Sequence, residues 1–529
     1  MSSALQSGYR LNGSNSRLGR VFLVGAGPGD PGLMTIRGAQ KLREADVILH
    51  DGLANPAFRS LTRHDAEWIS VGKHGCDRIW TQPEIDDAIV HHARLGKTIV
   101  RLKGGDTGVF ARTAEELERL NREGIAFEVV PGITAGLAAA AYTGIPITHR
   151  DWSSAVALVT GHFQASDGGP EFGEPADWAA LAKFPGTLVI YMGVTTASIW
   201  SQRLMNAGLS PDTAVALVRR CSWPDQETIL CTLEQVVDQL SPASNFRPPV
   251  IAIVGPVAHL GTQSDWFTKR PLFGRSVLIT RPARQAEGTL GRLADLGANV
   301  VTQSCIEILP LTHFEALDAR IGELSRYDWL VFTSANGVDH FFARLHALKF
   351  DGRELHRCRI AAVGPSVTAA LDRWKLRADL TPNGDVEKFN AEALAERLIQ
   401  EIFVQENHSN VRCLVVRTER GKPTIEIRLS ELGITVESVV VYQSVDVAEL
   451  DPETLKLLRS GEIDYALVTS TSIALNLAKL AGEVLGRTKL IAISADVAGT
   501  LENLGFSVFG ISRQSSIDSM IDWLVENEA

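Results

Sequence analysis

Short runs of β-branched and aliphatic residues alternate with helical patterns along this whole chain, and this alternation constrains the fold more than any other feature. Strands separated by helices predict an α/β architecture with largely parallel sheets. The chain has 529 residues, which predicts several domains rather than one. Expected strands of the first half are Arg20–Val24, Ala45–His50, Thr98–Leu102, Phe127–Val130, Ala155–Thr160, Thr187–Tyr191 and Pro249–Val254.

The segment Ser264–Arg275 divides the chain, because a proline and a glycine there separate two apolar patterns. A new strand is expected directly afterwards, at Ser276–Thr280. We therefore place the main boundary near residue 271, with one domain over 18–268 and the other over 272–529. Residues 1–17 lack the apolar core of a signal peptide and are expected to form a flexible polar leader.

The second half contains a weak internal repeat. Tyr327–Ser334 resembles Ile463–Ser470, and each is followed by a helical pattern and a further strand. Two similar lobes facing each other would explain the repeat, and a cleft between lobes is a usual ligand site. Any two strand–helix units look alike, however, so chance similarity is the alternative. We expect one lobe from 276–309 plus about 443–529, and an inserted lobe over about 310–442.

Charge and cysteine usage exclude several classes of protein. Lysine and arginine number 52 against 62 aspartates and glutamates, a net charge of −10, so we expect no general attraction to nucleic acid. The six cysteines form no C-x-x-C pair, which argues against a zinc site or a disulfide framework and suits a reducing cytoplasm. No apolar run approaches the roughly 18 residues of a membrane span. We expect a cytoplasmic protein without a metal.

Three strand-to-glycine turns occur early in the chain, at Gly25–Gly32, Lys103–Asp106 and Pro131–Gly136. Glycine lets backbone N–H groups approach a ligand closely, and ligands of α/β proteins bind outside the carboxyl ends of the strands. The first turn satisfies G-x-G-x-x-G, and Asp51 follows at the spacing of a ribose-binding acid. The two prolines of that turn remove donors that a dinucleotide site uses, so an NAD site is the weaker alternative. A Walker loop is excluded because no G-K-[ST] follows.

An ordered series of motifs over about 20–268 resembles uroporphyrinogen-III C-methyltransferase, of the tetrapyrrole methylase family: VFLVGAGPGDPGLMT, VILHDGL, VGKHG, RLKGGD, VVPGITAG, GIPITHR, VTGH and IYMG. The resemblance implies a two-lobed α/β fold that binds S-adenosylmethionine between its lobes, usually as a homodimer. It also displaces the NAD alternative. The donor contacts that it implies are Pro28, Gly104, Gly105, Asp106, Val109, Thr134, Ala135, Met192 and Ala216.

The same resemblance assigns Asp51 and Lys73 to the family's proposed base and acid. The sulfonium methyl is already electrophilic, so the pyrrole carbon must become nucleophilic and then lose a proton, which a carboxylate can accept. The substrate is a polycarboxylate, so basic side chains are candidate partners, with a solvated surface charge as the alternative for each. These candidates are Arg37, Arg101, Lys103, Arg112 and Arg150. Thr107–Ala114 departs from the family's usual P-F-V-F-G-R-G-G, so we expect a different loop geometry there.

From residue 272 onward the chain resembles uroporphyrinogen-III synthase, through VLITRP, YDWLVFTSANGV, IAAVGPSVTAAL and VVVYQS. The resemblance implies a second two-lobed α/β fold, which closes the linear tetrapyrrole hydroxymethylbilane with inversion of ring D and needs no cofactor. Tyr442 is the candidate general acid, and a packed core tyrosine is the alternative. Candidate substrate contacts at strand ends and helix N-termini are Arg281, Ser334, Asn336, Ser366 and Thr469.

Together the two resemblances describe neighbouring steps, because the synthase product is the methylase substrate. They predict a bifunctional enzyme that makes uroporphyrinogen III and methylates it at C2 and C7 to precorrin-2, for sirohaem or cobalamin. One alternative is a C-terminal half that only binds tetrapyrrole or regulates. Another is a methylase half that acts on a later, partly methylated corrinoid. In each case the partners are small tetrapyrroles, with no nucleic acid and no membrane.

Overall fold

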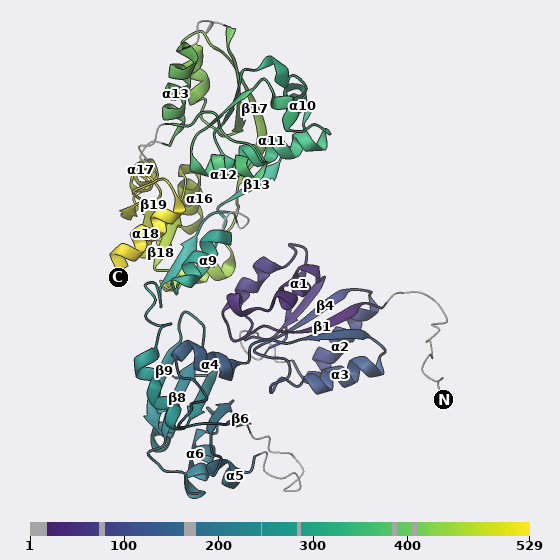
Figure 1. The fold of residues 1–529 in the computed structure, drawn as a ribbon, viewed down its shortest axis with the longest axis vertical. Helices are drawn as coiled ribbons and strands as arrows, with labels where there is room; N and C mark the ends of the chain where they lie inside the picture. Colours follow the sequence, from purple (N-terminus) through teal and green to yellow (C-terminus); the bar gives the residue numbers. More distant parts are fainter. Residues whose placement is uncertain are drawn as a thin grey trace, which may run out of the picture. The chain divides into compact units, whose positions relative to one another are not determined.

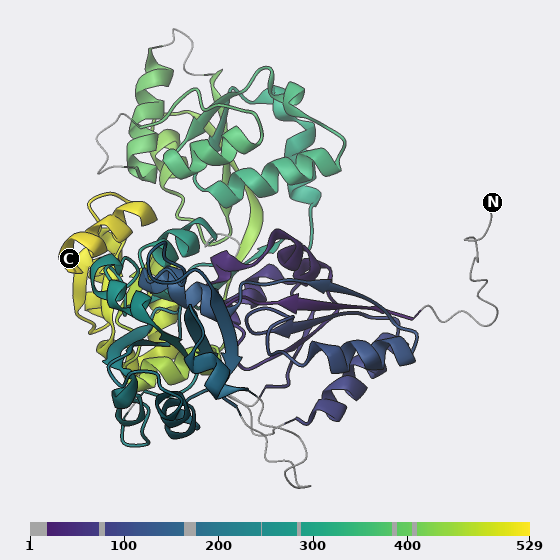
Figure 2. The same cartoon turned by 60° about the horizontal axis from the view of Figure 1, so that its bottom comes forward.

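The computed structural model describes residues 18–72, 80–162, 176–244, 246–282, 287–382, 389–404 and 410–528. The chain forms two compact units, Met1–Gly274 and Arg275–Ala529, and each is described by itself (Figure 1, Figure 2). Each unit contains two five-stranded sheets. Among the described residues, no helix combines the length and apolarity that crossing a lipid bilayer requires.

The first sheet of the first unit is entirely parallel, in the order β3-β2-β4-β1-β5. Its central strands are buried on both faces, which explains their almost uninterrupted apolar sequence. Helix α1 covers one face, while α2 and α3 cover the other (Figure 1). The elements are β1 (Arg20–Gly25), α1 (Ile36–Glu44), β2 (Val47–His50), β3 (Glu67–Ser70), α2 (Gln82–Arg94), β4 (Thr98–Lys103), α3 (Thr113–Arg122) and β5 (Ala126–Val130).

The second sheet of this unit has the order β6-β7-β10-β8-β9, and its strands are mostly antiparallel. Our expectation of largely parallel sheets is wrong here, because the connection between β8 and β9 is too short for a crossover and closes a hairpin instead. The elements are α4 (Ala135–Thr143), β6 (Val156–Thr160), α5 (Trp178–Ala182), β7 (Thr187–Tyr191), α6 (Ala197–Asn206), β8 (Ala214–Arg219), β9 (Glu227–Thr232), α7 (Val236–Gln239), β10 (Val250–Val254) and α8 (Gly261–Ser264).

The second unit has an outer lobe whose sheet is built from two separate parts of the chain. Its strand order is β12-β11-β18-β19-β20, and all pairs are parallel. The elements are β11 (Ser276–Ile279), α9 (Glu287–Asp295), β12 (Asn299–Thr302), α15 (Pro452–Ser460), β18 (Tyr465–Val468), α16 (Thr471–Ala481), β19 (Lys489–Ala492), α17 (Ala495–Asn503), β20 (Val508–Ile511) and α18 (Ile517–Glu528).

The inserted lobe has the strand order β13-β17-β16-β14-β15. Strand β13 (Ile306–Pro310) pairs antiparallel with β17 (Thr435–Asp446), so residues 306–309, which we expected in the outer lobe, lie in the inserted sheet. The hydrogen bonds between β13 and β17, and not the position of residues 306–309 in the sequence, determine the sheet to which these residues belong. The other elements are α10 (Glu315–Gly322), β14 (Trp329–Phe332), α11 (Ala335–Ala347), β15 (Arg359–Ala362), α12 (Pro365–Arg373), α13 (Ala391–Phe403), β16 (Arg412–Thr418) and α14 (Thr424–Ser430).

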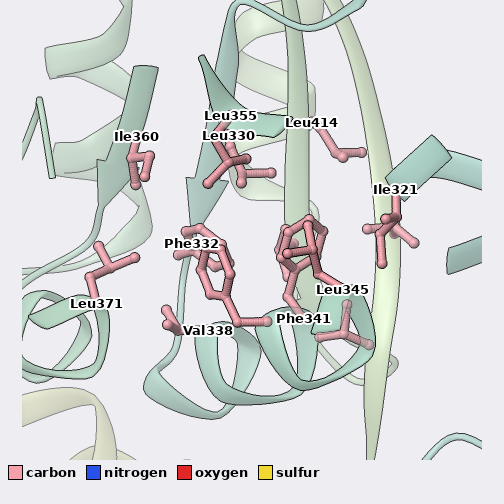
Figure 3. Close-up of a cluster of buried hydrophobic side chains, with 14 of the residues drawn as sticks. Ile321, Leu330, Phe332, Val338, Phe341, Leu345, Leu355, Ile360, Leu371 and Leu414 are labelled. Atoms are coloured by element: carbon pink, nitrogen blue, oxygen red, sulfur yellow. The ribbon is translucent and has the colours of Figure 1, made fainter. Parts of the chain in front are cut away.

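The repeat noticed in the sequence corresponds to β14–α11 and β18–α16. In each, a fully buried strand leads to a serine that caps the following helix: Ser334 Oγ accepts from Gly337 N at 3.0 Å, and Ser470 Oγ from Ile473 N at 3.2 Å. Figure 3 shows side chains of the inserted lobe, including Phe332 and Phe341, gathered between sheet and helix, with 5.7 Å between their ring centroids. The same packing therefore presents an equivalent serine turn on each lobe.

Candidate functional site

The three glycine turns of the first unit lie in backbone contact at one edge of the parallel sheet. Gly27 and Gly105 exchange two hydrogen bonds, with N···O distances of 3.0 and 2.8 Å. A Cβ added to Gly132 would stand 2.4 Å from the carbonyl oxygen of Gly105, so only glycine fits there. Asp106 joins the second and third turns, because its Oδ2 accepts from Gly132 N at 2.9 Å. The turns predicted as a ligand site thus form one continuous backbone surface.

Tyr191, which the sequence analysis did not single out, connects this surface to the second lobe. Its hydroxyl lies 2.8 Å from both Thr134 Oγ1 and Gly136 N, at the start of α4. Burial raises the pKa of this phenol, so it stays protonated near neutral pH. The next residue, Met192, has a left-handed φ of 54° and is 47% exposed. The tyrosine of the IYMG motif therefore anchors the turn that presents Met192.

Trp223 is a second residue that sequence reasoning missed. Its indole Nε1 donates to the carbonyl of Pro28 at 3.1 Å, and its ring fills the space that a side chain on Gly29 would need. The neighbouring Ser222 Oγ accepts from Asp30 N at 3.0 Å. These bonds hold the first glycine turn to the loop after β8. The signal available in the sequence was an aromatic residue before a proline at the end of a strand.

The other residues that are predicted to contact the methyl donor differ in their solvent accessibility. Ala135 and Val109 are half-buried beside the third turn, whereas Thr134 is buried and hydrogen-bonded. Ala216 lies in the middle of β8 with no exposed surface. Its side chain packs in one of the apolar cores beside the sheet, and its contact with the methyl donor stays a prediction.

Asp51 follows β2 and is held by two donors. Arg101 Nη2 donates to its Oδ1 at 2.5 Å, and Gly104 N donates to its Oδ2 at 3.2 Å. The side chain remains 29% exposed. Each carboxylate oxygen has a second lone pair, so Asp51 can still accept a proton from a ligand on its exposed side. Lys73, the predicted acid, lies outside the described residues.

Two predicted substrate partners are not at the surface. The side chains of Arg101 and Lys103 are 5% and 2% exposed, and both pair with the fully buried Glu116 of α3. Their charges are already paired inside the lobe, and their contact with substrate carboxylates stays a prediction. Sequence alone showed two basic residues on one face of a strand but not that a helix carrying a carboxylate covers that face.

The remaining basic candidates are exposed. Arg37 makes a two-pronged ion pair with Glu128, at 2.7 and 2.8 Å, and its side chain is 52% exposed. Arg112 pairs with Glu115 at 2.8 and 2.6 Å and is 57% exposed. Arg150 lies exposed in a turn. Surface ion pairs are weak, so a polycarboxylate can compete for these arginines.

The loop that departs from the family pattern has an unusual backbone. Phe110 and Arg112 both adopt left-handed φ angles, 51° and 54°, which non-glycine residues rarely do. Phe110 is 41% exposed, and its ring lies 5.1 Å from that of Tyr191. Phe110, which matches the family pattern, therefore places an aromatic ring next to the glycine turns.

In the inserted lobe of the second unit, Tyr442 lies beside the serine turn at the end of β14. A β-bulge opposite Arg417 and Thr418 shifts the register of β17, so Tyr442 faces the same core as its neighbour Val441. Its hydroxyl lies 3.2 Å from Ser334 Oγ, and the ring of His340 stacks on it at 5.4 Å. Burial lowers the pKa of His340, which favours the neutral ring.

The other predicted contacts of this unit occupy strand ends on both lobes. Asn336 begins α11 half-buried, and Ser366 is exposed in the first turn of α12. On the outer lobe, Thr469 follows β18 and Arg281 follows β11, both half-buried. Burial lowers the pKa of the Arg281 guanidinium, and no ion pair to it is described. In the described parts of the chain, no cluster of three or more histidine, cysteine or acidic side chains could hold a metal ion.

Comparisons with known proteins match a different family in each of the two units. Residues 20–237 match the family of Tetrapyrrole (Corrin/Porphyrin) Methylases, and residues 288–522 match Uroporphyrinogen-III synthase HemD. The "Porphyrin biosynthesis protein HemD" of Ruminiclostridium josui is 34% identical over 96% of this chain and 98% of its own length. The "Uroporphyrinogen-III C-methyltransferase" of Bacillus subtilis is 37% identical over 69% of this chain and 74% of its own.

A solved structure is also similar to part of this chain. Uroporphyrin-III C-methyl transferase from Thermus thermophilus, complexed with S-adenosyl homocysteine, is 37% identical to this chain. It covers 46% of this chain and 100% of the solved one, with a TM-score of 0.39.

Proposed function

This chain belongs to the tetrapyrrole methylases through its first unit and to the uroporphyrinogen-III synthases through its second, and we propose that the units catalyse consecutive steps. The second unit closes hydroxymethylbilane to uroporphyrinogen III with inversion of ring D. The first transfers two methyl groups from S-adenosylmethionine to C2 and C7, which gives precorrin-2. The similarity to a single relative along nearly its whole length is the observation that carries this conclusion.

The glycine turns fit a methyl donor of this kind. Gly105 has a left-handed φ of 71°, and a Cβ there would have the backbone of Ala135 3.7 Å away as its nearest neighbour. The space over the turn is therefore open to a ligand rather than filled by the protein. Gly104, Gly105, Asp106 and Met192 would hold S-adenosylmethionine, which supplies an electrophilic methyl group when bound.

Asp51 would accept the proton that methylation releases. A carbon–methyl bond forms at the pyrrole ring and the sulfur–methyl bond breaks, so the sulfonium becomes a neutral thioether. The methylated ring carbon already carries a side chain and has no proton, so the cationic macrocycle loses a proton from a pyrrole nitrogen or a bridging carbon to the Asp51 carboxylate, and charge balances. Gly104 N donates a hydrogen bond of 3.2 Å to Asp51, so the proton acceptor is fixed relative to the glycine turns that would bind the methyl donor. Lys73 would supply the complementary acid.

In the second unit, Tyr442 would protonate the departing hydroxyl of hydroxymethylbilane. Its hydroxyl contacts Ser334 Oγ, which also caps α11, so the phenol is held at a helix N-terminus. Helix N-termini favour anionic groups, which suits the carboxylate side arms of a tetrapyrrole. Asn336, Ser366, Thr469 and Arg281 would bind those side arms.

We also propose that the protein works in the cytoplasm as a homodimer formed through its methyltransferase unit, on tetrapyrroles and not on nucleic acid. Apolar side chains on and beside α4 support the dimer, since Leu137 is 50% exposed and Ile133 is 38% exposed. Light scattering of the purified chain should give twice the monomer mass, and a monomer would contradict the proposal.

The direct test is anaerobic incubation of the purified chain with hydroxymethylbilane, with and without S-adenosylmethionine. Products are oxidised and separated by isomer and mass. We expect type III uroporphyrin without the donor and a dimethylated product with it. Type I isomer alone would mean that ring closure is spontaneous and that the second unit is not a synthase. Uroporphyrinogen III supplied directly would then test the first unit separately.

A Gly132→Ala substitution should weaken donor binding by at least about tenfold. The added methyl group would stand 2.4 Å from the Gly105 carbonyl, so two of the glycine turns must separate to admit it. Calorimetric titration with S-adenosylhomocysteine measures the effect. Gly499→Ala is the matched control, because a Cβ there meets nothing within 4 Å and the residue lies in the other unit. Unchanged binding by Gly132→Ala would remove this turn from the donor site.

A further inference from the structure

Four charged side chains form a continuous chain of ion pairs behind the exposed edge of Asp51. We call Asp51, Arg101, Glu116 and Lys103 the buried charge chain. Arg101 links Asp51 at 2.5 Å to Glu116 at 3.1 Å, and Glu116 also contacts Lys103. The side chains of Arg101, Glu116 and Lys103 are 5%, 0% and 2% exposed, against 29% for Asp51. Asp51 is thus the member of the chain that reaches a ligand.

Secondary structure dictates this arrangement. Arg101 and Lys103 are two positions apart on β4, so both point to the face that α2 and α3 cover. Glu116 lies in the first turns of α3, where the helix dipole favours a carboxylate. Gln82, at the start of α2, donates to Glu116 Oε1 at 3.4 Å. Glu116 is therefore satisfied on all sides by groups that do not meet the substrate.

Glu116 pairs with the guanidinium of Arg101, which holds Asp51. Arg101 uses Nε for Glu116, Nη2 for Asp51, and Nη1 for the carbonyls of Leu49 and Leu102 at 3.4 and 3.2 Å. The group has no remaining freedom to rotate. The buried charge chain contains two cations and two anions, so it is neutral as a whole. Removal of one charge would leave a net charge in a region of low dielectric, where its effect on Asp51 is strong.

We propose that Glu116 is a positioning residue for methyl transfer: it fixes the Arg101 guanidinium and balances its charge, and thereby sets the orientation of the Asp51 carboxylate. This inference rests on the proposed role of Asp51 as proton acceptor. It assigns to Glu116 and Lys103 a function in catalysis without any contact with donor or substrate.

Glu116→Gln is the first test, since it keeps the shape of the side chain and removes its charge. Arg101 then loses its charged partner at Nε, so the guanidinium that orients the Asp51 carboxylate is held less firmly. We expect kcat for methylation of uroporphyrinogen III to fall about 10- to 100-fold, with KM for donor and substrate changed less than about twofold.

A double variant separates charge from structure. Glu116→Gln with Lys103→Met restores the neutrality of the buried charge chain. The kcat of this double variant should therefore be at least about fivefold higher than that of Glu116→Gln alone. A role in packing alone predicts the opposite, because two altered side chains disturb the lobe more than one. Asp87→Asn is the control, since Asp87 pairs with Arg119 at 3.0 Å on the outer surface of α2 and is 68% exposed. It should leave kcat and KM unchanged.

Parallel measurements on Asp51→Asn distinguish the failure of this inference from failure of the proposed function. If Asp51→Asn methylates normally, the role of Asp51 is wrong. If Asp51→Asn is inactive while folded Glu116→Gln keeps the kcat of the original chain, the positioning role alone is wrong. Equal loss of kcat in the single and double variants would also overturn it. Binding of S-adenosylhomocysteine and thermal unfolding of the first unit, measured on each preparation, verify that the unit carrying these substitutions is folded.

Discussion

Replacement of Asp51 with alanine should lower the rate of methylation about 100- to 10,000-fold while cyclisation of hydroxymethylbilane by the same chain stays within about twofold. The range is that of a lost general base. Asp51 belongs to the first unit, and residues Arg275–Ala529 fold around separate cores. Both rates are measured on one preparation, by type III uroporphyrin without the donor and by dimethylated product from uroporphyrinogen III with it.

Asp46 provides a closely matched control at the other end of the same strand. Asp46 Oδ2 accepts from Thr98 N at 2.8 Å, and its Oδ1 accepts from Arg63 at 3.0 Å. Asp51 likewise accepts from one backbone N–H and one arginine. If loss of such a structural carboxylate were sufficient to stop methylation, the rate of methylation by Asp46→Ala would fall as much as that of Asp51→Ala. We expect instead a modest loss of stability and a normal rate. Equal loss of methylation and cyclisation in Asp51→Ala would refute the division of labour.

The arrangement of the glycine turns was predictable from the sequence, because it depends on local rules. Strands of a parallel sheet end at one edge, so turns after β1, β4 and β5 had to meet. The bonds between Gly27 and Gly105, and the fit of Gly132 against Gly105, follow from this register. The serine turns at Ser334 and Ser470 were visible for the same reason, since a capping residue follows each buried strand.

The surroundings of these turns depend on contacts between distant segments, which a single sequence does not contain. The period-2 pattern placed Arg101 and Lys103 on one face of β4, but whether that face meets solvent or a helix depends on where α3 packs. The contact between Trp223 and Pro28 joins residues 195 positions apart. Likewise, the hydrogen bond from Gly136 N to the Tyr191 hydroxyl joins two lobes. The charges of Arg101 and Lys103 and their alternation along β4 therefore suggested contacts with substrate, whereas in the structure both side chains form buried ion pairs.

The same limit applies to the boundary of the inserted lobe. Residues 306–309 follow the first strands of the outer lobe, and nothing local separates them from those strands. Their place is set by β17, which is twelve residues long and extends beyond the inserted lobe's other strands to pair with β13. How far a strand extends depends on the segment with which it pairs in the fold, and a single sequence does not show this. The boundary predicted from the sequence therefore lies a few residues too late.

Tyr442→Phe should slow cyclisation about 10- to 100-fold and leave methylation unchanged. The substitution removes one hydroxyl from a side chain that is 5% exposed, and the ring keeps its packing in the core of the inserted lobe. Ser334 loses a partner at 3.2 Å but still accepts from Gly337 N, so the cap of α11 is preserved. A loss of activity would therefore report on the phenolic proton and not on the fold. The rate of type III uroporphyrin formation from hydroxymethylbilane measures it.

Tyr327→Phe is the control that makes this result decisive. Tyr327 is also buried in the inserted lobe, 1% exposed, and its hydroxyl donates to Glu437 at 3.0 Å near the start of β17, away from the serine turn. Loss of that hydrogen bond to a carboxylate should cost about 1.5–3 kcal/mol of stability and leave the rate of cyclisation intact. If both variants cyclise normally, Tyr442 is a packed core residue and another group must protonate the leaving hydroxyl. If both lose activity together with thermal stability, the hydroxyls support the fold. Only a selective loss in Tyr442→Phe assigns the proton to this phenol, because burial, lobe and side-chain type are the same in the two positions.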